Sequence, residues 1–159
     1  MNSEQRTVLM DWRFAHFDEV GVRDLYDIMS LRTAVFIVEQ ACVYQDPDGV
    51  DPKSHHLWCR TAGGDIGAYL RVVPPGVKYD EPSLGRIITS AGARGTGLGR
   101  SVVQEGIARA RVLYGAVPIR IGAQRYLLRF YESLGFRATG HDYDEDGIPH
   151  SEMLLPQPL

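Results

Sequence analysis

Four glycines lie within the segment AGARGTGLGRSV, residues 91–102, directly before a stretch of helix-forming sequence. A glycine loop that opens onto a helix can bind phosphate, because no Cβ atoms keep phosphate oxygens away from the backbone N–H groups. The helix N-terminus adds a partial positive charge, and Arg94 and Arg100 can add charge-assisted hydrogen bonds. The segment therefore predicts a phosphate site. The alternative is a structural turn that only starts the helix.

Two common phosphate-binding motifs do not fit this loop. A Walker loop needs Lys and Ser or Thr after its last glycine, but Leu98 and Gly99 stand there. The dinucleotide fingerprint G-x-G-x-x-G fails in either register, because a larger residue stands where the third glycine is required. A third pattern, [QR]-x-x-G-x-[GA], fits with Arg94, Gly97 and Gly99.

This third pattern resembles the pyrophosphate loop of the GNAT N-acetyltransferase superfamily, whose members bind acetyl-CoA. Downstream, FYESLGF at residues 130–136 is similar to the Y-x-x-x-G-F helix end that the superfamily places beside the thioester. The segments LRTAVFIVEQACVYQDPDGVD, IGAQRYLLRFYESLGF and YDEDGIPH resemble its ElaA-like branch, whose members are described as predicted acyltransferases. The resemblance covers residues 9–155.

The resemblance implies an N-acetyltransferase that passes an acetyl group from acetyl-CoA to a primary amine of a small molecule or peptide, within a ternary complex. A non-catalytic acyl-CoA sensor with the same fold is the alternative. The presence of Tyr131 together with the loop motif favours the enzyme, because a sensor has no need of an acid.

The resemblance also implies which residues surround the cofactor. In the superfamily, the strand before the loop exposes backbone groups to the pantetheine, and by position these belong to Ile87, Ile88 and Thr89. The residues expected around the diphosphate are Arg94, Gly95, Thr96, Gly97, Leu98, Gly99 and Arg100. Many members carry an asparagine shortly after the fifth strand, whereas this sequence has Gln124 there, which still offers an amide.

Tyr131 is the candidate acid for the leaving group. A phenol with a reference pKa of about 10 is protonated at neutral pH and can donate to a thiolate of pKa near 8.5. The alternative is a core tyrosine in an amphipathic helix, beside Phe130 and Leu134.

An amine acceptor with a pKa of about 10.4 must lose a proton before it attacks, so the site needs a base. Glu39 is the first candidate, because it follows the apolar run AVFIV, where a carboxylate can be partly desolvated. Its alternative is a helix-end carboxylate that pairs with Arg32 or a backbone donor. His150 is the second candidate, since imidazole titrates near neutrality, although a histidine at a strand start is often structural. His55 and His56 are weaker candidates.

Acidic residues gather in YQDPDGVD, residues 44–51. They can attract a cationic amine, and the expected substrate contacts are Glu39, Tyr44, Asp46 and His150. The spacing is also similar to a calcium loop, but Pro47 and the lack of a glutamate at the twelfth position exclude that reading, and no metal is expected. A solvated turn capped by its own aspartates is the alternative.

Apolar periodicity and turn residues predict the elements that hold these groups. Strands are expected within residues 7–17, 55–62, 66–73, 84–90, 117–123, 137–144 and 150–155, and helices at 22–38, 98–114 and 124–136. This order predicts an α/β domain with a mixed, mostly antiparallel central sheet flanked by helices. The resemblance specifies it as the GNAT-type acyl-CoA N-acyltransferase fold.

Length and composition indicate a single domain, residues 1–159, with 44% hydrophobic and 23% charged residues. A net charge of −3 gives no general attraction to nucleic acid or an anionic membrane. The N-terminal segment has no long apolar run, so neither a signal peptide nor a membrane span is expected. Two isolated cysteines, Cys42 and Cys59, are typical of a reducing cytoplasm. The oligomeric state stays open, a homodimer through the final strands being one arrangement.

Overall fold

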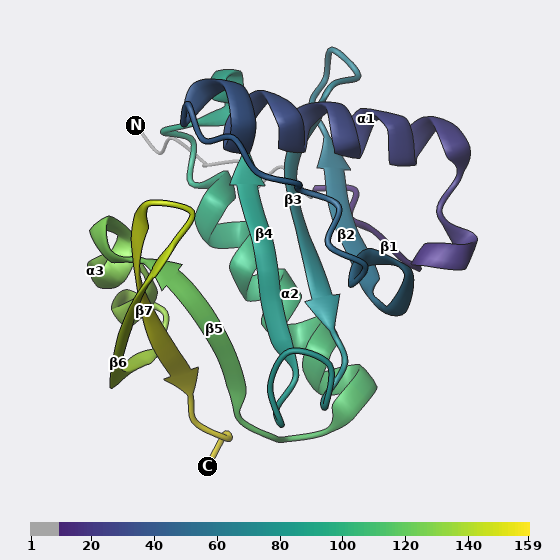
Figure 1. The fold of residues 1–159 in the computed structure, drawn as a ribbon. Coiled ribbons are helices and arrows are strands. Elements are labelled where there is room, and N and C mark those ends of the chain that lie inside the picture. Colours follow the sequence, from purple (N-terminus) through teal and green to yellow (C-terminus); the bar gives the residue numbers. More distant parts are fainter. Residues whose placement is uncertain (1–9) are drawn as a thin grey trace, which may run out of the picture.

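The computed structural model describes residues 10–159, whose strands form one seven-stranded sheet in the order β1-β2-β3-β4-β5-β7-β6 (Figure 1). The elements are β1 (Arg13–His16), α1 (Val22–Arg32), the π-helix η2 (Thr33–Glu39), β2 (His55–Arg60), β3 (Ile66–Val73), β4 (Ser83–Thr89), α2 (Leu98–Tyr114), β5 (Ile119–Gln124), α3 (Leu128–Ser133), β6 (Arg137–Glu145) and β7 (Ile148–Leu155). The predicted order of strands and helices is confirmed. Residues 7–9 of the first predicted strand lie outside the described residues.

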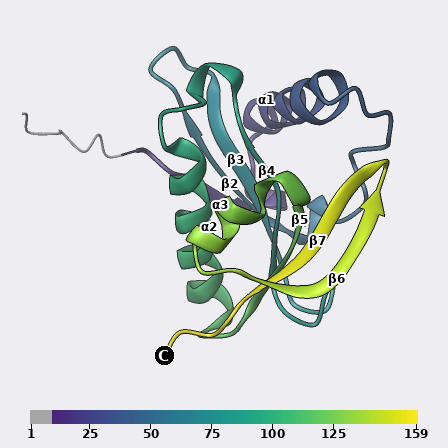
Figure 2. The same cartoon turned by 90° about the vertical axis from the view of Figure 1, so that its left-hand side faces the viewer.

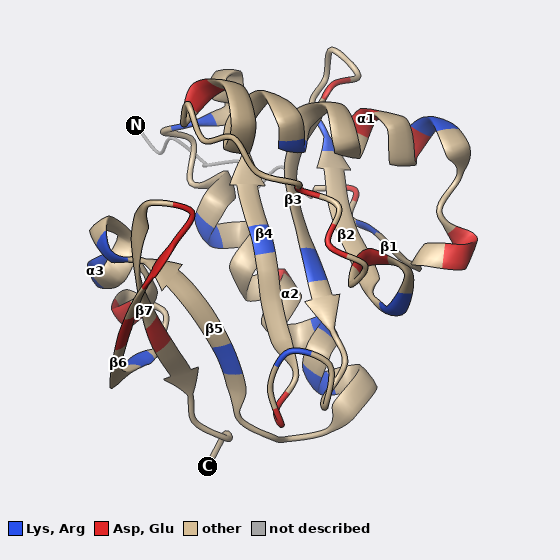
Figure 3. Ribbon diagram, viewed as in Figure 1, with Lys and Arg blue, Asp and Glu red and all other residues tan. Residues whose placement is uncertain are grey.

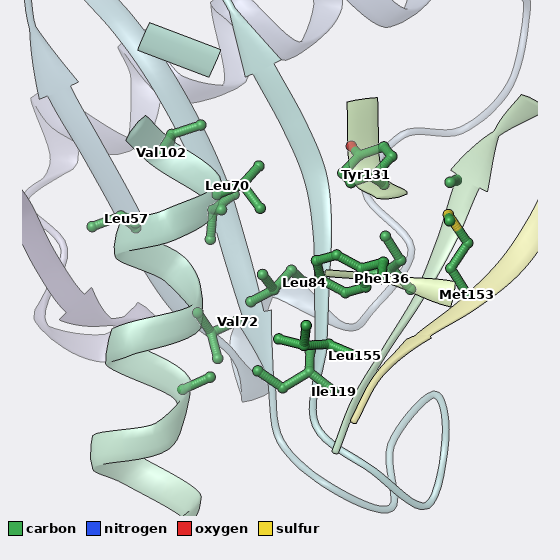
Figure 4. Close-up of a cluster of buried hydrophobic side chains, with 14 of the residues drawn as sticks. Leu57, Leu70, Val72, Leu84, Val102, Ile119, Tyr131, Phe136, Met153 and Leu155 are labelled. Carbon is green, nitrogen blue, oxygen red and sulfur yellow. The ribbon is translucent and has the colours of Figure 1, made fainter. Parts of the chain in front are cut away.

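Helices cover both faces of the sheet, with α1 and η2 on one side and α2 and α3 on the other (Figure 2). The larger core lies under α2 and α3, where Leu70, Val102 and Phe136 are completely or almost completely buried (Figure 4). A second core lies under α1 and includes Ile28, Trp58 and Tyr69. Burial on both faces explains why β3 reads as an unbroken apolar run except at one arginine.

The first predicted helix extends to Glu39, but its last part is wider than an α-helix. Gln40 N–H donates to the carbonyl of Val35, and Cys42 N–H donates to the carbonyl of Ile37, which are spacings of five residues. Four β-branched residues between positions 33 and 38 lower the α-helix propensity here. The wide turns bury Val35 and leave Glu39 at the helix end, and such turns often occur at functional sites.

The sheet opens between β4 and β5, its one parallel pair within residues 10–159. These strands are paired only at Ser83 and Arg120, and then they separate, as Figure 1 shows. A bulge in β4 places Arg86 and Ile87 opposite a single residue of β3, and Arg86 has the positive φ of +50°. The bulge turns the end of β4 away from β5 and leaves its backbone edge without a strand partner on that side. Among the described residues, no helix is long and apolar enough to cross a membrane.

Candidate active site

A cleft of about 610 Å³ lies where β4 and β5 separate. Its walls come from the end of η2, from β4 and β5, from α3, and from the hairpin that joins β6 to β7. The glycine loop, residues 91–97, follows the C-terminal end of β4 and lies at one end of the cleft. The cleft thus joins the predicted phosphate site to the predicted catalytic residues.

The glycine loop presents unused backbone donors. Within the described part of the chain, the N–H groups of residues 95–100 donate no backbone hydrogen bond. Gly95 and Gly97 have φ values of +78° and +83°, and nothing lies within 4 Å of the position that a Cβ would take at either residue. Helix α2 begins at Leu98, so its positive end adds to these donors. The loop fits a diphosphate group.

The two arginines of the loop are placed differently. Arg94 donates two hydrogen bonds to the carboxylate of Glu39, one of them at 2.7 Å, and it lines the cleft. Arg100 donates to the hydroxyl and the carbonyl of Ser133 at 2.8 and 3.1 Å and so ties α2 to α3. The guanidinium of Arg100 is therefore engaged within the protein, and its role at the diphosphate stays a prediction.

The contact with Arg94 also bears on the role of Glu39. Hydrogen bonds from Arg94 lower the pKa of the Glu39 carboxyl, which makes the carboxylate a weaker base. The alternative expectation, a pair between Glu39 and Arg32, is wrong, because Arg32 binds two aspartates instead. The structure thus places Glu39 at the cleft, but already engaged by the phosphate loop.

The end of β4 has the arrangement that was expected for pantetheine contact. Ile87, Ile88 and Thr89 line the cleft, and their backbone has no partner on the β5 side. The side chain of Ile88 is 5% exposed and packs in the core under α1. Gln124, the last residue of β5, lines the opposite wall, and its amide nitrogen lies 3.5 Å from the side-chain oxygen of Gln40.

Tyr131 lies on α3 between the core and the cleft. Its ring packs edge-on against Phe130, with ring centroids 5.0 Å apart, and against Phe136, with centroids 5.9 Å apart. Figure 4 shows Tyr131 and Phe136 in the core. The residue is 5% exposed and lines the cleft, and its hydroxyl has no hydrogen-bond partner among residues 10–159. Burial raises the pKa of the phenol above its ordinary value of 10. The hydroxyl is therefore protonated and is a donor without a partner.

His150 on β7 faces the cleft with a defined tautomer. Its Nδ1 lies 2.7 Å from the carbonyl oxygen of Ile148; a carbonyl only accepts, so Nδ1 carries the hydrogen. Its Nε2 lies 3.5 Å from a carboxylate oxygen of Glu145. The ring is stacked on Tyr143, 5.4 Å between centroids. Sequence reasoning missed Glu145 and Tyr143, although the pairing of β6 with β7 brings both to His150.

Of the aspartates of the acidic loop, Asp48 lines the cleft and Asp46 and Asp51 do not. Arg32, which is fully buried, binds Asp46 at 2.9 Å and Asp51 at 2.7 Å, and Arg71 binds Asp48 at 2.7 Å. Figure 3 shows the basic positions on β3 and β4 facing this acidic segment. Asp46 is 4% exposed. Its assignment as a substrate contact is therefore wrong, because both its oxygens are bound by arginines, Arg32 and Arg86.

Tyr44 stays on the cleft wall, where it was expected. Arg86 lies over its ring, 5.7 Å from the centroid, and burial is the main cause that raises the pKa of its hydroxyl to about 12. The two weaker histidine candidates lie away from the cleft. His56 is 1% exposed and lies 2.7 Å from the hydroxyl of Tyr69, and His55 stacks on Phe14.

Comparisons with known proteins agree with this geometry. A family model described as an acetyltransferase (GNAT) domain matches residues 26–156. A UPF0039 protein of Synechocystis is 38% identical over 94% of this chain and 97% of its own. Protein ElaA of Escherichia coli is 34% identical over 91% of this chain and 95% of its own.

Solved structures give the same result. The crystal structure of Escherichia coli ElaA matches with a TM-score of 0.84 and 33% identity over 92% of this chain and 99% of that one. An acyl-CoA N-acyltransferase from Pseudomonas aeruginosa matches with a TM-score of 0.84 and 35% identity over 91% and 99%.

Proposed function

The chain belongs to the GNAT acetyltransferase family and has its fold, and on that premise we propose that it transfers an acetyl group from acetyl-CoA to a primary amine. The expected resemblance to the ElaA-like branch is confirmed at the level of the family. Family membership supports an acyltransferase. The choice of acetyl-CoA as the donor and of a small-molecule or peptide amine as the acceptor is our proposal.

One observation carries the proposal: the edge of β4 that has no strand partner and the unused backbone donors at the N-terminus of α2 lie along the same cleft. The N–H groups of residues 95–100 can bind the diphosphate, and the edge of residues 87–89 can pair with the pantetheine. Because Gly95 and Gly97 leave open the space that side chains would fill, phosphate oxygens can reach the backbone.

Bound acetyl-CoA would supply a thioester as acyl donor and a thiolate as leaving group. A backbone N–H of residues 87–89 can donate to the carbonyl oxygen as it gains negative charge, and one such donor contributes about 2.7–4 kcal/mol in comparable sites. Tyr131 can donate its hydrogen bond to the sulfur. The raised pKa of its phenol keeps this donor protonated but makes it a weaker acid. It therefore stabilises the thiolate mainly through the hydrogen bond.

We assign the base to His150 rather than to Glu39. The Nδ1–H of His150 is held by a carbonyl, which leaves the Nε2 lone pair to accept a proton from the amine. Glu145, 3.5 Å from that nitrogen, can hold the ammonium before the transfer and stabilise the imidazolium after it. Glu39 instead binds Arg94, so in our proposal it positions that arginine beside the diphosphate.

The competing function is an acyl-CoA sensor with the same cleft. Free thiol released from acetyl-CoA in the presence of a panel of amines distinguishes the two functions, and calorimetry measures binding of acetyl-CoA alone. We expect binding together with amine-dependent thiol release. Binding without release for every amine would support the sensor, and the absence of binding would contradict both functions.

A further inference from the structure

Lys78 lies in the turn between β3 and β4 and lines the cleft. The sequence contains two lysines, at positions 53 and 78, against a majority of arginines among its 17 basic residues. Within residues 10–159, no carboxylate lies within 4 Å of the Lys78 ammonium. A cation on a cleft wall without an ionic partner is suited to bind an anion that arrives with a ligand.

The other cations near Lys78 are already balanced. Arg71 binds Asp48 at 2.7 Å, and Arg86 binds Asp46 at 2.7 Å. Desolvation lowers the pKa of the Lys78 ammonium, and the positive charges of Arg71 and Arg86 lower it further. A bound anion beside Lys78 would therefore offset the repulsion between Lys78 and the two arginines, and it would give Lys78 an ionic partner.

The position of Lys78 along β4 indicates which ligand would bring the anion. The phosphate loop follows the C-terminal end of β4, whereas Lys78 precedes its N-terminal end. Seven extended residues separate the two ends by roughly 20 Å at about 3.3 Å per residue. The diphosphate cannot lie at both places, so the anion near Lys78 belongs to the acceptor.

The hairpin of β6 and β7 carries a carboxylate, Glu145, whose charge is opposite to that of Lys78, and beside it the imidazole of His150. Glu145 and the Nε2 of His150 lie 3.5 Å apart, and both line the same cleft as Lys78. Lys78 and Glu145 line the same cleft, and the attraction of Glu145 partly offsets the lowering of the Lys78 pKa. The acceptor end of the cleft thus has an acidic wall for an ammonium and a basic wall for an anion.

We propose that the acceptor is a small amine that carries an anionic group, in the manner of an amino acid. Lys78 pairs with the anion, and Glu145 and His150 receive the ammonium. The inference rests on the proposed acetyl transfer and specifies its substrate class. It disfavours internal peptide amines, which carry no anion beside the reacting nitrogen.

The test measures thiol release from acetyl-CoA with standard amino acids and with their neutral carboxamides as acceptors. Aminomethylphosphonate is included as an amine with a different anionic group. We expect wild type to favour the anionic amines over the matched carboxamides by about 10- to 100-fold in kcat/KM, the effect of one hydrogen bond to a charged group. Preference for carboxylates or for the phosphonate identifies the anion, and either supports the inference.

Variants separate a role in recognition from a role in structure. Lys78→Met should raise KM for the anionic amines and leave the carboxamides unchanged, whereas Lys78→Arg should keep the preference. Lys53→Met is the matched control and should behave as wild type, because Lys53 is exposed as Lys78 is but does not line the cleft. Equal use of acids and carboxamides by wild type, or an equal loss for both in Lys78→Met, would overturn the inference. Thiol release at a rate that no amine of the panel increases would overturn the proposed function as well.

Discussion

Tyr131 and His150 reach the cleft from different elements, and each presents one polar atom to it. The ring of Tyr131 belongs to the core, so only its hydroxyl is available for chemistry. His150 is held through Nδ1 by the carbonyl of Ile148 and by stacking on Tyr143, so its Nε2 has a fixed direction. At the scale of residues, our proposal therefore assigns one donor to the sulfur and one acceptor to the amine proton.

Replacement of Tyr131 by phenylalanine removes the donor and keeps the packing of the ring. Turnover should fall by about 10²-fold, within the usual range for an acid, while affinity for acetyl-CoA stays nearly unchanged. Steady-state thiol release checks this. Tyr114→Phe, which changes a half-buried tyrosine outside the cleft, is the matched control. A Tyr131→Phe protein with full activity, measured where chemistry limits turnover, would leave Tyr131 a core residue only.

The two candidate bases can be compared directly. His150→Gln should lower turnover by about 10²-fold or more, because an amide of similar shape cannot take the proton. Glu39→Gln should change turnover only severalfold, because in our proposal Glu39 positions Arg94 and does not take the proton. Both are measured at saturating amine. A larger loss in Glu39→Gln than in His150→Gln would return the base to Glu39.

Two departures from regular secondary structure shape the walls of the cleft. The π-helix η2 places Glu39 beside the phosphate loop, and the bulge at Arg86 turns the end of β4 away from β5. A buried cluster of ion pairs holds both, since Asp46 accepts hydrogen bonds from Arg32 at the end of α1 and from Arg86 in the bulge. At the scale of elements, this cluster connects the helix, the acidic loop and the splayed strand.

Removal of one member of this cluster should be costly. Arg32→Met leaves the buried carboxylates of Asp46 and Asp51 without their main partner, and such losses are about 3–5 kcal/mol in free energy of unfolding. Urea denaturation measures it. Arg60→Met, which breaks two pairs with the more exposed Asp24 and Asp27, is the control and should cost about 1 kcal/mol or less. Similar losses in the two variants would show that the cluster is not a structural requirement.

At the scale of the whole molecule, the sheet opens between β4 and β5, and the cleft lies in this opening. The sequence predicted the order of elements, and it predicted α2 at its observed bounds, because apolar periodicity and the glycine loop mark that helix clearly. Of the residues expected around the cofactor, six line the cleft, and their role in binding stays a prediction: Ile87, Ile88, Thr89, Arg94, Gly99 and Gln124.

Other features could not be predicted, because they depend on contacts between distant residues. The pairs of Arg71 with Asp48 and of Arg94 with Glu39 join positions 23 and 55 residues apart, and local patterns carry no sign of them. For this reason Asp46 was assigned to the substrate and Lys78 was overlooked. The π-turns of η2 were missed because a segment of seven residues is too short to show an apolar period of its own.

The central claim is that acetyl-CoA binds with its diphosphate on the loop before α2, and calorimetry on one pair of variants tests it directly. Gly97→Val places a branched side chain in the open space over the loop, and Gly115→Val makes the same change at the other end of α2. Both glycines have a positive φ, +83° and +84°, but ψ is 3° at Gly97 and −172° at Gly115, so the control variant carries at least as much backbone strain as the test variant. Binding to wild type and Gly115→Val, with a loss of about 10-fold or more in folded Gly97→Val, is the predicted result. Equal affinity in all three folded proteins would contradict the account.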